Sequence, residues 1–410
     1  MVGPLVEVWL PYGSSEVPAR IPAERLVDVL GLERQPDSQD YLTEAKQTLE
    51  SNEPMSKIAS ESKRTCIAVG ACGHQQTATE LVGLVVQFLA SKSTAPIVIL
   101  RTQDAPDLQP SALSQATILN HDPVISPTTA LPGFNGPFTV QLNSDFLNAD
   151  LKILIGELKP HALLKFEGLT DMILPGLTSL ATRTEHVSNR TGLGLADLYR
   201  ERVQVTESVE NVFMFGFVLP DGVNPIQFTC ESSRLSLETL EKAVEATFAK
   251  EFTKKADIVV MGAGGKPADG SLARVVETLP VGLSALKKNG TLILAAECEY
   301  GHGDGEFYDW CAEGKEARYL EARLRRRLNY GGFKASLLRR TLDSHRVYLI
   351  STIPDHYVES IFKIRPARTI SAALLTAQRT LGSDATISVI PNANRVIPKL
   401  IETQKQALQP

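Results

Sequence analysis

Two histidines, His161 and His186, are the residues best suited to chemistry by their type and position. His161 follows a proline at the end of an apolar run that begins at Leu151, and His186 follows the pair Pro175-Gly176. An imidazole changes charge near neutral pH, so His161 at the exit of a strand suits proton transfer, with a structural role as the alternative. His186 suits metal ligation through a neutral ring nitrogen, and an ordinary structural position is equally open.

Two glycine-containing turns have a spacing that could bind phosphate. The turns are Gly70-x-x-Gly73 and Gly262-x-Gly-Gly265, and each follows a buried strand. Backbone N–H groups at a helix start bind phosphate, and His74 beside the first turn could donate to an anion. Neither turn has the third glycine of a dinucleotide fingerprint, so a tight connection between strand and helix is the alternative.

The elements that position these residues alternate between strand and helix. Buried strands are expected at 65–69, 96–100 and 151–155 in the first part of the chain, with a helix at about 77–91. Strands at 256–261, 290–296 and 347–351 repeat the pattern in the second part. Such alternation predicts doubly wound α/β sheets, in which loops at the carboxyl ends of strands converge on a crevice.

The chain is long enough for two cores. With 410 residues it exceeds what one hydrophobic core normally organises. We place an N-terminal α/β domain at residues 1–252, to which a C-terminal segment at 384–410 returns, and a second α/β domain at 253–383. The site is expected in the cleft between the two domains.

Composition excludes several classes of function. The net charge of -5 gives no electrostatic reason to expect nucleic acid. No apolar segment reaches the roughly 18 residues that span a bilayer, and the N-terminus lacks a charged region before an apolar one. We therefore expect a soluble, cytoplasmic protein without nucleic-acid or membrane partners. Its five cysteines are an odd number with no paired short spacing, which favours reduced thiols.

Beyond these local patterns, the chain resembles a known family. The segment from Ala149 to His161, the motif Ile173-Leu-Pro-Gly176 and His186 resemble the central signature of the nickel-dependent lactate racemase family. The Asn120-His-Asp stretch, the Gly-Gly-x-Pro-x-Asp269 block, the Glu297-Cys-x-x-Gly301 loop and the closing Val-Ile-Pro391 are similar as well. The resemblance implies two α/β domains around a cleft, with the last strand returning to the first domain.

The resemblance also implies a chemistry. In the family, nickel sits in a pincer made from a nucleotide-derived pyridinium, which is tethered through a lysine and further held by a histidine. The metal complex accepts a hydride from the substrate while a histidine removes the hydroxyl proton. His161 corresponds to one acid/base histidine, and His186 is the nearest counterpart of the nickel ligand.

The sequence departs from the family at positions that handle the cofactor. The tethering lysine is replaced by Asp171, and a carboxylate cannot form that link. The phosphate-handling turn is replaced by Ala71-Cys-Gly-His-Gln, so Gly73, His74 and Gln75 are the cofactor-binding candidates left there.

Substrate-handling positions differ too. Gln103 stands where the second catalytic histidine belongs and cannot act as a base, although it stays a substrate-binding candidate. Arg274 and Glu277 replace a glutamine and a lysine that face the substrate carboxylate. Arg274 can bind a carboxylate bidentately, whereas Glu277 would repel one.

Together these observations predict a divergent racemase-like isomerase that acts on a 2-hydroxy acid or sugar acid, with His161 as acid/base. The predicted cofactor is a nickel-pincer nucleotide bound without the covalent link, and the predicted partner is a small hydroxy-acid-like ligand. A homologue that lost racemisation and binds a small anion or nucleotide is the alternative, and homo-oligomerisation is left open. A nicotinamide dehydrogenase is disfavoured because no Gly-x-Gly-x-x-Gly is present.

Overall fold

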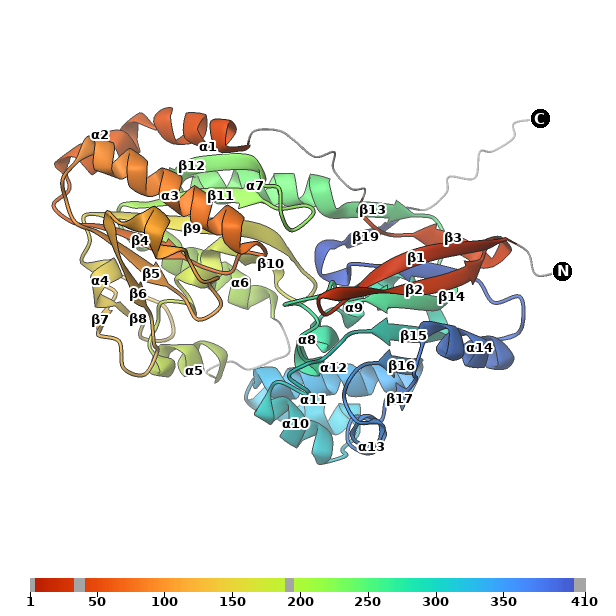
Figure 1. Cartoon of the computed structure of the whole chain (residues 1–410). Helices are drawn as coiled ribbons and strands as arrows, with labels where there is room; N and C mark the ends of the chain where they lie inside the picture. Colours follow the sequence, from red (N-terminus) through yellow and green to blue (C-terminus); the bar gives the residue numbers. More distant parts are fainter. Residues whose placement is uncertain (1–3, 33–40, 189–194, 402–410) are drawn as a thin grey trace, which may run out of the picture.

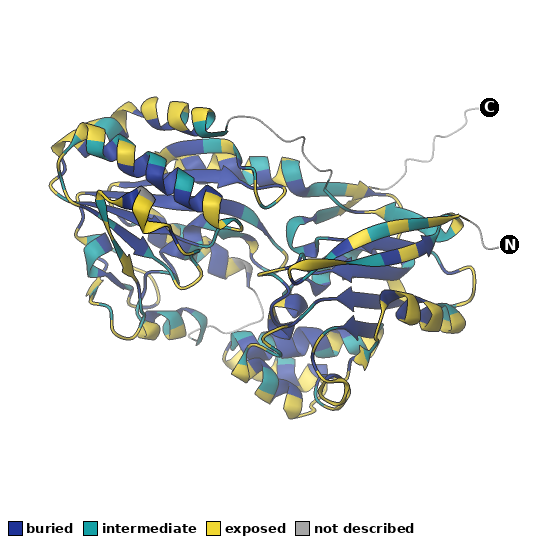
Figure 2. Ribbon diagram, in the orientation of Figure 1, coloured by how far each residue is buried: buried dark blue, intermediate teal, exposed yellow. Residues whose placement is uncertain are grey.

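A computed structural model describes residues 4–32, 41–188 and 195–401 of the chain. Two sheets, both built largely from parallel strands, lie next to each other, and helices cover the faces of each (Figure 1). Figure 2 shows that the strands are buried while exposed residues lie on the outer sides of the helices. This architecture confirms the predicted fold class of two α/β domains.

The first sheet has the strand order β12-β11-β9-β4-β5-β6, with β10 paired to β9. Its strands are β4 (Thr65–Val69), β5 (Ile97–Arg101), β6 (Ala116–Asn120), β9 (Leu151–His161), β10 (Lys165–Gly168), β11 (Val212–Val218) and β12 (Ile226–Ser232). The neighbours β11, β9, β4, β5 and β6 run parallel, while β12 and β10 are antiparallel to their partners.

Alternating residues of the first sheet fill two different cores. Ile153 and Ile155 of β9 pack on one face, whereas Leu154 and Leu158 pack on the other. The first face is covered by α1 (Tyr41–Glu50), α2 (Glu53–Glu61) and α3 (Gln75–Lys92). The second is covered by α4 (Ser144–Leu147), η3 (Leu169–Met172), α6 (Ala196–Glu207) and α7 (Ser233–Phe248). A strand buried on both faces reads as a continuous apolar run, which is why β9 was recognisable.

The second sheet is parallel throughout, with the order β17-β16-β15-β14-β18-β3. Its strands are β3 (Leu26–Val29), β14 (Ala256–Gly262), β15 (Leu286–Ala295), β16 (Arg346–Ile350), β17 (Arg365–Pro366) and β18 (Ile387–Ile390). One face carries α8 (Leu272–Glu277), α9 (Leu279–Ala285), α10 (Gly305–Ala312), α11 (Ala317–Arg326), α12 (Tyr330–Ser344) and α13 (Asp355–Ser360). The other carries α14 (Ile370–Leu381) and the hairpin of β1 (Leu5–Tyr12) and β2 (Ser15–Pro22).

Smaller elements complete the chain. They are η1 (Ala23–Arg25), η2 (Pro110–Leu113), β7 (Thr128–Ala130), β8 (Gln141–Asn143), α5 (Leu180–Ser188), β13 (Ala249–Phe252), η4 (Ala393–Arg395) and β19 (Ile397–Leu400). β13 and β19 pair in parallel at the junction between the two sheets. Within the described ranges no helix is long and apolar enough to cross a membrane. All five cysteines are free thiols, as predicted.

The predicted domain boundaries are wrong at both ends of the chain. The N-terminal 30 residues were assigned to the first domain, yet Leu10 and Ile21 of the β1–β2 hairpin pack on the second sheet, and β3 pairs with β18. The segment from 384 was expected to return to the first domain, yet β18 lies inside the second sheet beside β14. Apolar faces at the two ends of the chain are buried by the same sheet, and sequence distance carries no information about that pairing.

Two local predictions also need correction. Residues 23–30 were read as partly helical, but only η1 forms there and the rest is strand β3. Residues after 155 were read as a loop, but β9 continues to His161 because β10 returns antiparallel to it. A backbone with a ladder partner stays extended even when its side chains are polar.

Candidate active site between the two sheets

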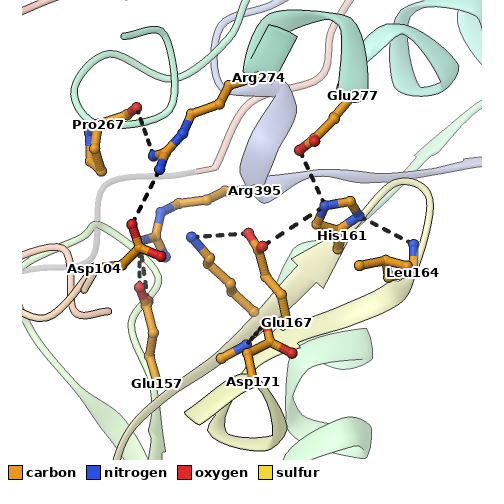
Figure 3. A network of polar contacts seen from close by, with 12 residues as sticks. Asp104, Glu157, His161, Leu164, Glu167, Asp171, Pro267, Arg274, Glu277 and Arg395 are labelled. Atoms are coloured by element: carbon orange, nitrogen blue, oxygen red, sulfur yellow. Dashed lines mark hydrogen bonds and ion pairs between the residues drawn. The ribbon is translucent and has the colours of Figure 1, made fainter. Parts of the chain in front are cut away.

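His161 is the last residue of β9 and stands at the tip of the β9–β10 hairpin, where it pairs with Lys165. The side chains of Glu157, Lys159 and His161 share one face of β9 because successive strand residues alternate. That polar face points toward the second domain, where α8 and Glu277 lie (Figure 3). The hairpin therefore carries an acid, a lysine and a histidine into the space between the two sheets.

The two ring nitrogens of His161 have different partners. Nδ1 accepts hydrogen bonds from the backbone N–H groups of Leu163 at 3.1 Å and Leu164 at 3.2 Å. Nε2 lies 3.4 Å from Glu277 Oε2 and 3.8 Å from Glu167 Oε2. Because Nδ1 accepts, the proton of the neutral imidazole is on Nε2, directed at the carboxylates.

Each carboxylate beside His161 also contacts a lysine. Glu167 Oε1 lies 3.1 Å from Lys159 Nζ on the neighbouring strand of the hairpin. Glu277 Oε1 lies 2.8 Å from Lys334 Nζ on α12, and the Lys334 side chain is only 9% exposed. The result is a mostly buried network of alternating charge that links the first domain to the second.

This network shifts the pKa of its members. Burial alone would raise the pKa of Glu277, but the hydrogen bond from His161 and the charge of Lys334 lower it to about 2. Burial alone would lower the pKa of His161, but Glu167 and Glu277 outweigh it and raise the pKa above its ordinary value. The two N–H donors on Nδ1 oppose protonation there, so a gained proton requires the hairpin tip to rearrange.

Asp171, at the predicted cofactor-tether position, lies in η3 behind the hairpin. Its Oδ2 accepts from the backbone N–H of Gly168 at 3.0 Å, and its Oδ1 is 2.6 Å from Arg202 Nη1 on α6. Burial raises the pKa of Asp171, and the Arg202 charge offsets part of that shift. Asp171 therefore holds the turn after β10 and pairs with an arginine.

The three residues predicted to bind cofactor phosphate lie at the β4–α3 turn. Gly73 and Gln75 are exposed, and His74 is the N-cap of α3, where Nδ1 accepts from Thr77 N at 3.3 Å. The nearest guanidinium is that of Arg395, which is 3.2 Å from Glu157 Oε2. His74 thus acts as a helix cap, which satisfies one orphan N–H of the first turn.

The two predicted substrate-binding residues lie at the rim of the cleft. Arg274 Nη2 is 3.4 Å from Asp104 Oδ1, and Nη1 donates to Pro267 O at 3.3 Å (Figure 3). Gln103, next to Asp104, accepts from Arg183 Nη1 at 2.8 Å. The structure therefore brings the loop after β5 and the helix α8 together through the Arg274–Asp104 pair, and substrate binding by Gln103 and Arg274 stays a prediction.

His186, the predicted metal ligand, lies in the last turn of α5 and is buried. Its Nε2 is 3.5 Å from Glu201 Oε2, and its ring centroid is 5.3 Å from that of Phe138. Across 4–32, 41–188 and 195–401, no group of three or more His, Cys, Asp or Glu side chains is arranged to hold a metal ion. Metal ligation by His186 stays a prediction.

Comparisons with known proteins agree with the geometry. The sequence model of the family described as "Lactate racemase C-terminal domain" matches residues 252–398. The lactate racemase of Thermoanaerobacterium thermosaccharolyticum is 30% identical over 273 residues, which are 63% of this chain and 63% of that protein. The lactate racemase of Lactiplantibacillus plantarum is 26% identical over 275 residues, 63% of this chain and 64% of that protein. The second part of the chain thus matches the lactate racemase C-terminal domain, and the chain is similar in sequence to two lactate racemases.

The matches to these two relatives span under two thirds of each relative's length, whereas the match in fold spans nearly all of this chain. The lactate racemase apoprotein from T. thermosaccharolyticum superposes with a TM-score of 0.81, at 22% identity, over 96% of this chain and 100% of that one. A Thermotoga maritima protein superposes with a TM-score of 0.61, at 12% identity, over 87% of this chain and 98% of that one.

The residues present do not fit a lysine-tethered cofactor. Position 171 is a carboxylate already engaged by Arg202, and the β4–α3 turn offers no side-chain cation of its own for a phosphate. The arginine nearest to that turn, Arg395, is paired with the buried carboxylate of Glu157. Internal ion pairs therefore occupy the positions at which the resemblance places the tether and the phosphate contacts.

Several site residues were missed at the level of sequence. They are Glu157, Lys159, Arg202, Tyr330, Lys334 and Arg395. A signal existed for two of them, because Glu157 and Lys159 alternate with Leu158 and Pro160 and so share the face of His161. The others lie on helices or turns far along the chain, and only the packing of those elements brings them to the hairpin.

Proposed function

We propose that this protein is a racemase-type isomerase that acts on a small hydroxy acid in the cleft between its two sheets. The observation that carries the proposal is the position of His161, which lies in the interdomain space with Nε2 directed at Glu277 of the opposite domain. Similarity in sequence to two lactate racemases supports the reaction class.

In this proposal the hairpin tip rearranges to free Nδ1 from its two N–H donors, and the freed ring nitrogen takes the hydroxyl proton of the substrate, which leaves the ring positively charged. Before this rearrangement, the backbone N–H groups of Leu163 and Leu164 on Nδ1 fix the ring orientation and the tautomer. Glu167 and Glu277 stabilise the ring when it carries positive charge. His161 can thus act as a general base whose charged form is stabilised by two carboxylates.

Arg274 supplies the contact for the substrate carboxylate in this proposal. Its pair with Asp104 is exposed on both sides, with side chains 49% and 71% accessible. An exposed ion pair contributes only about 0–1 kcal/mol, so a ligand carboxylate can displace Asp104 at little cost. Arg274 then forms two parallel hydrogen bonds to the carboxylate.

The isomerase proposal is tested by incubating single enantiomers of lactate and related 2-hydroxy acids with the protein, followed by chiral chromatography. We expect interconversion by the wild type and a loss of about 100-fold or more in His161→Gln, because a general acid/base typically contributes that much. Interconversion that is unchanged in His161→Gln would contradict the role of His161. No interconversion with any substrate would contradict the isomerase itself.

The cofactor prediction is tested separately. Protein co-expressed with a pincer-synthesis pathway is analysed by native mass spectrometry, denaturing mass spectrometry and nickel assay. A non-covalent nickel-pincer nucleotide adds mass under native conditions and none after denaturation, because Asp171 cannot form the link. The absence of both nickel and added mass under saturating conditions would contradict cofactor binding.

A specific observation favours a second function, the binding of a small anion without turnover. Asp171, a carboxylate paired with Arg202, stands where the resemblance places the tethering lysine, whereas Arg274 stays available to an anion because its pair with Asp104 is exposed. A ligand that binds the native state raises the unfolding temperature. Stabilisation by hydroxy acids or nucleotides without interconversion would support this function over isomerisation.

A further inference from the structure

A cavity of about 350 Å³ lies at the tip of the β9–β10 hairpin, on the side of the β13–β19 junction. The hairpin contributes Pro160 and Phe166 to its wall, while Val281 of α9 and Ile397 of β19 close it from the other side. Glu277 and Arg274 do not line this cavity. Of the candidate active-site residues, only His161 lines it.

The interior of the cavity is apolar. Pro160, Phe166, Val281 and Ile397 present hydrocarbon or aromatic surface, and the prolines of the wall have no N–H to donate. Its volume falls at the lower end of the roughly 300–1,000 Å³ that is typical of small-molecule sites. An apolar group of a few carbon atoms is therefore the kind of group that it accommodates.

The rim of the cavity is charged, and its charges are not equivalent. Lys165 lies 3.4 Å from Glu241 and 3.5 Å from Glu245, which also lines the cavity, so two carboxylates of α7 engage this one ammonium. Lys399 is exposed and has no ion-pair partner within the described residues. The rim therefore offers one ammonium group to an incoming anion, directly beside an apolar interior.

We propose that this cavity binds a small monocarboxylic acid, with its apolar tail among Pro160, Phe166 and Val281 and its carboxylate at Lys399. Burial of the tail supplies most of the binding free energy, and the ammonium of Lys399 selects an acid over a neutral molecule. The proposal rests on the cavity and is independent of the reaction in the cleft.

Occupancy of the cavity is transmitted to the candidate active site through His161. One part of the imidazole lines the cavity while Nε2 faces Glu277, and both domains contribute walls. A ligand that fills the cavity restrains the hairpin tip against α9 and β19. The NMR signals of His161 therefore shift when the acid binds, even in the absence of a substrate in the cleft.

The test uses calorimetric titration of the full chain with hexanoate and with hexanamide, its uncharged counterpart. Hexanoate is expected to bind about two- to fivefold more tightly, since one exposed charge contact is worth up to about 1 kcal/mol. Lys399→Gln should weaken hexanoate to the level of hexanamide, and Lys288→Gln, at an exposed lysine elsewhere, should leave both affinities unchanged.

A substitution that fills the cavity tests whether hexanoate binds there. Ala162 is exposed and lines the cavity, so Ala162→Phe fills it with little effect on folding, and Ala162→Ser is the size-matched control. Loss of both ligands in Ala162→Phe but not in Ala162→Ser supports the proposal. Unchanged affinity in Ala162→Phe, or no hexanoate binding by the wild type up to about 20 mM, overturns it. Equal affinity for hexanamide overturns the role of Lys399.

Discussion

At the scale of single residues, the carboxylates of Glu167 and Glu277 together raise the pKa of His161. Glu277 approaches His161 Nε2 at 3.4 Å and is itself held by Lys334 at 2.8 Å. Its carboxylate favours the charged form of the imidazole, in opposition to the burial that disfavours it. The pKa of His161 is therefore set largely by side chains from the opposite domain and the hairpin.

Glu277→Gln is expected to lower the pKa of His161, because the amide keeps the shape of the side chain and removes its negative charge. Titration of the His161 ring protons by NMR measures the change. Glu359→Gln, at an exposed glutamate on α13, is the control and should leave this pKa unchanged. If the pKa of His161 is equal in Glu277→Gln and the wild type, Glu277 does not contribute to raising it.

At the scale of elements, the β9–β10 hairpin depends on a turn that only glycine permits. Gly168 has φ +122°, and a Cβ there would lie 2.0 Å from the carbonyl oxygen of Glu157. The hairpin positions His161 and Glu167 together, so its backbone geometry decides the geometry of the site.

Gly168→Ala is expected to destabilise the protein by at least about 3 kcal/mol, because backbone strain and a backbone clash add. Gly133→Ala is the matched control, since Gly133 also has positive φ (+73°) but nothing lies within 4 Å of its added Cβ. Urea unfolding should show a loss of only about 1 kcal/mol for the control. Equal losses in the two variants would mean that the contact with Glu157 is harmless.

A second element-scale feature is Asp257, which joins the starts of β14 and β18. Its carboxylate accepts from Thr386 N at 3.0 Å and Thr386 Oγ1 at 2.6 Å, and Lys287 Nζ is 2.9 Å away. Burial alone would raise the pKa of Asp257, but these donors outweigh it and lower the pKa. Because the pKa of Asp257 is lower in the folded than in the unfolded protein, the ionised carboxylate stabilises the fold at pH values above the unfolded-state pKa. This stabilisation is lost as the pH falls through the pKa of the folded state.

Asp257→Asn is therefore expected to reduce the free energy of unfolding at pH 7 by about 1–3 kcal/mol, the range for hydrogen bonds to a charged group. The difference from the wild type should shrink as the pH falls below the model-peptide range of about 4. Urea titrations at pH 7 and at low pH measure it, with Asp343→Asn on the exposed side of α12 as control. A difference that does not change with pH would exclude the carboxylate charge as its cause.

At the scale of the whole molecule, ion pairs that join the two sheets differ strongly in burial. Arg395, which follows β18, pairs with Glu157 of β9, and the two side chains are 13% and 2% exposed. Arg274 pairs with Asp104, and those side chains are 49% and 71% exposed. The first pair fastens the two domains in a dry environment, whereas the second lies in solvent at the rim.

Arg395→Ala is expected to cost about 3–5 kcal/mol in the free energy of unfolding, because it leaves the Glu157 carboxylate buried and unpaired. Arg274→Ala is expected to cost under about 1 kcal/mol, as is typical of an exposed pair. Chemical denaturation of both variants provides the comparison. Similar losses for the two would show that burial does not decide the strength of these interdomain contacts.

The parts of the fold that could be predicted from the sequence were those determined by residues close together in the chain. β4, β9 and β14 each contain a short apolar run, and each is buried on both faces of its sheet. His161 was identified because a proline and a histidine end such a run. Elements held by distant partners were missed, as β3 and β10 show, since a short strand is extended because of its neighbour and not because of its own residues.

By itself the sequence determined the α/β class, the lactate racemase likeness and the place of His161 at a strand end. Only the tertiary structure decided that the N-terminal hairpin joins the second sheet, that Asp171 pairs with Arg202, and that His161 faces Glu277. The physical reason is the distance along the chain over which each kind of interaction acts. Apolar periodicity and turn residues act over a few positions, whereas the partner of a buried charge is chosen by whichever element packs against it.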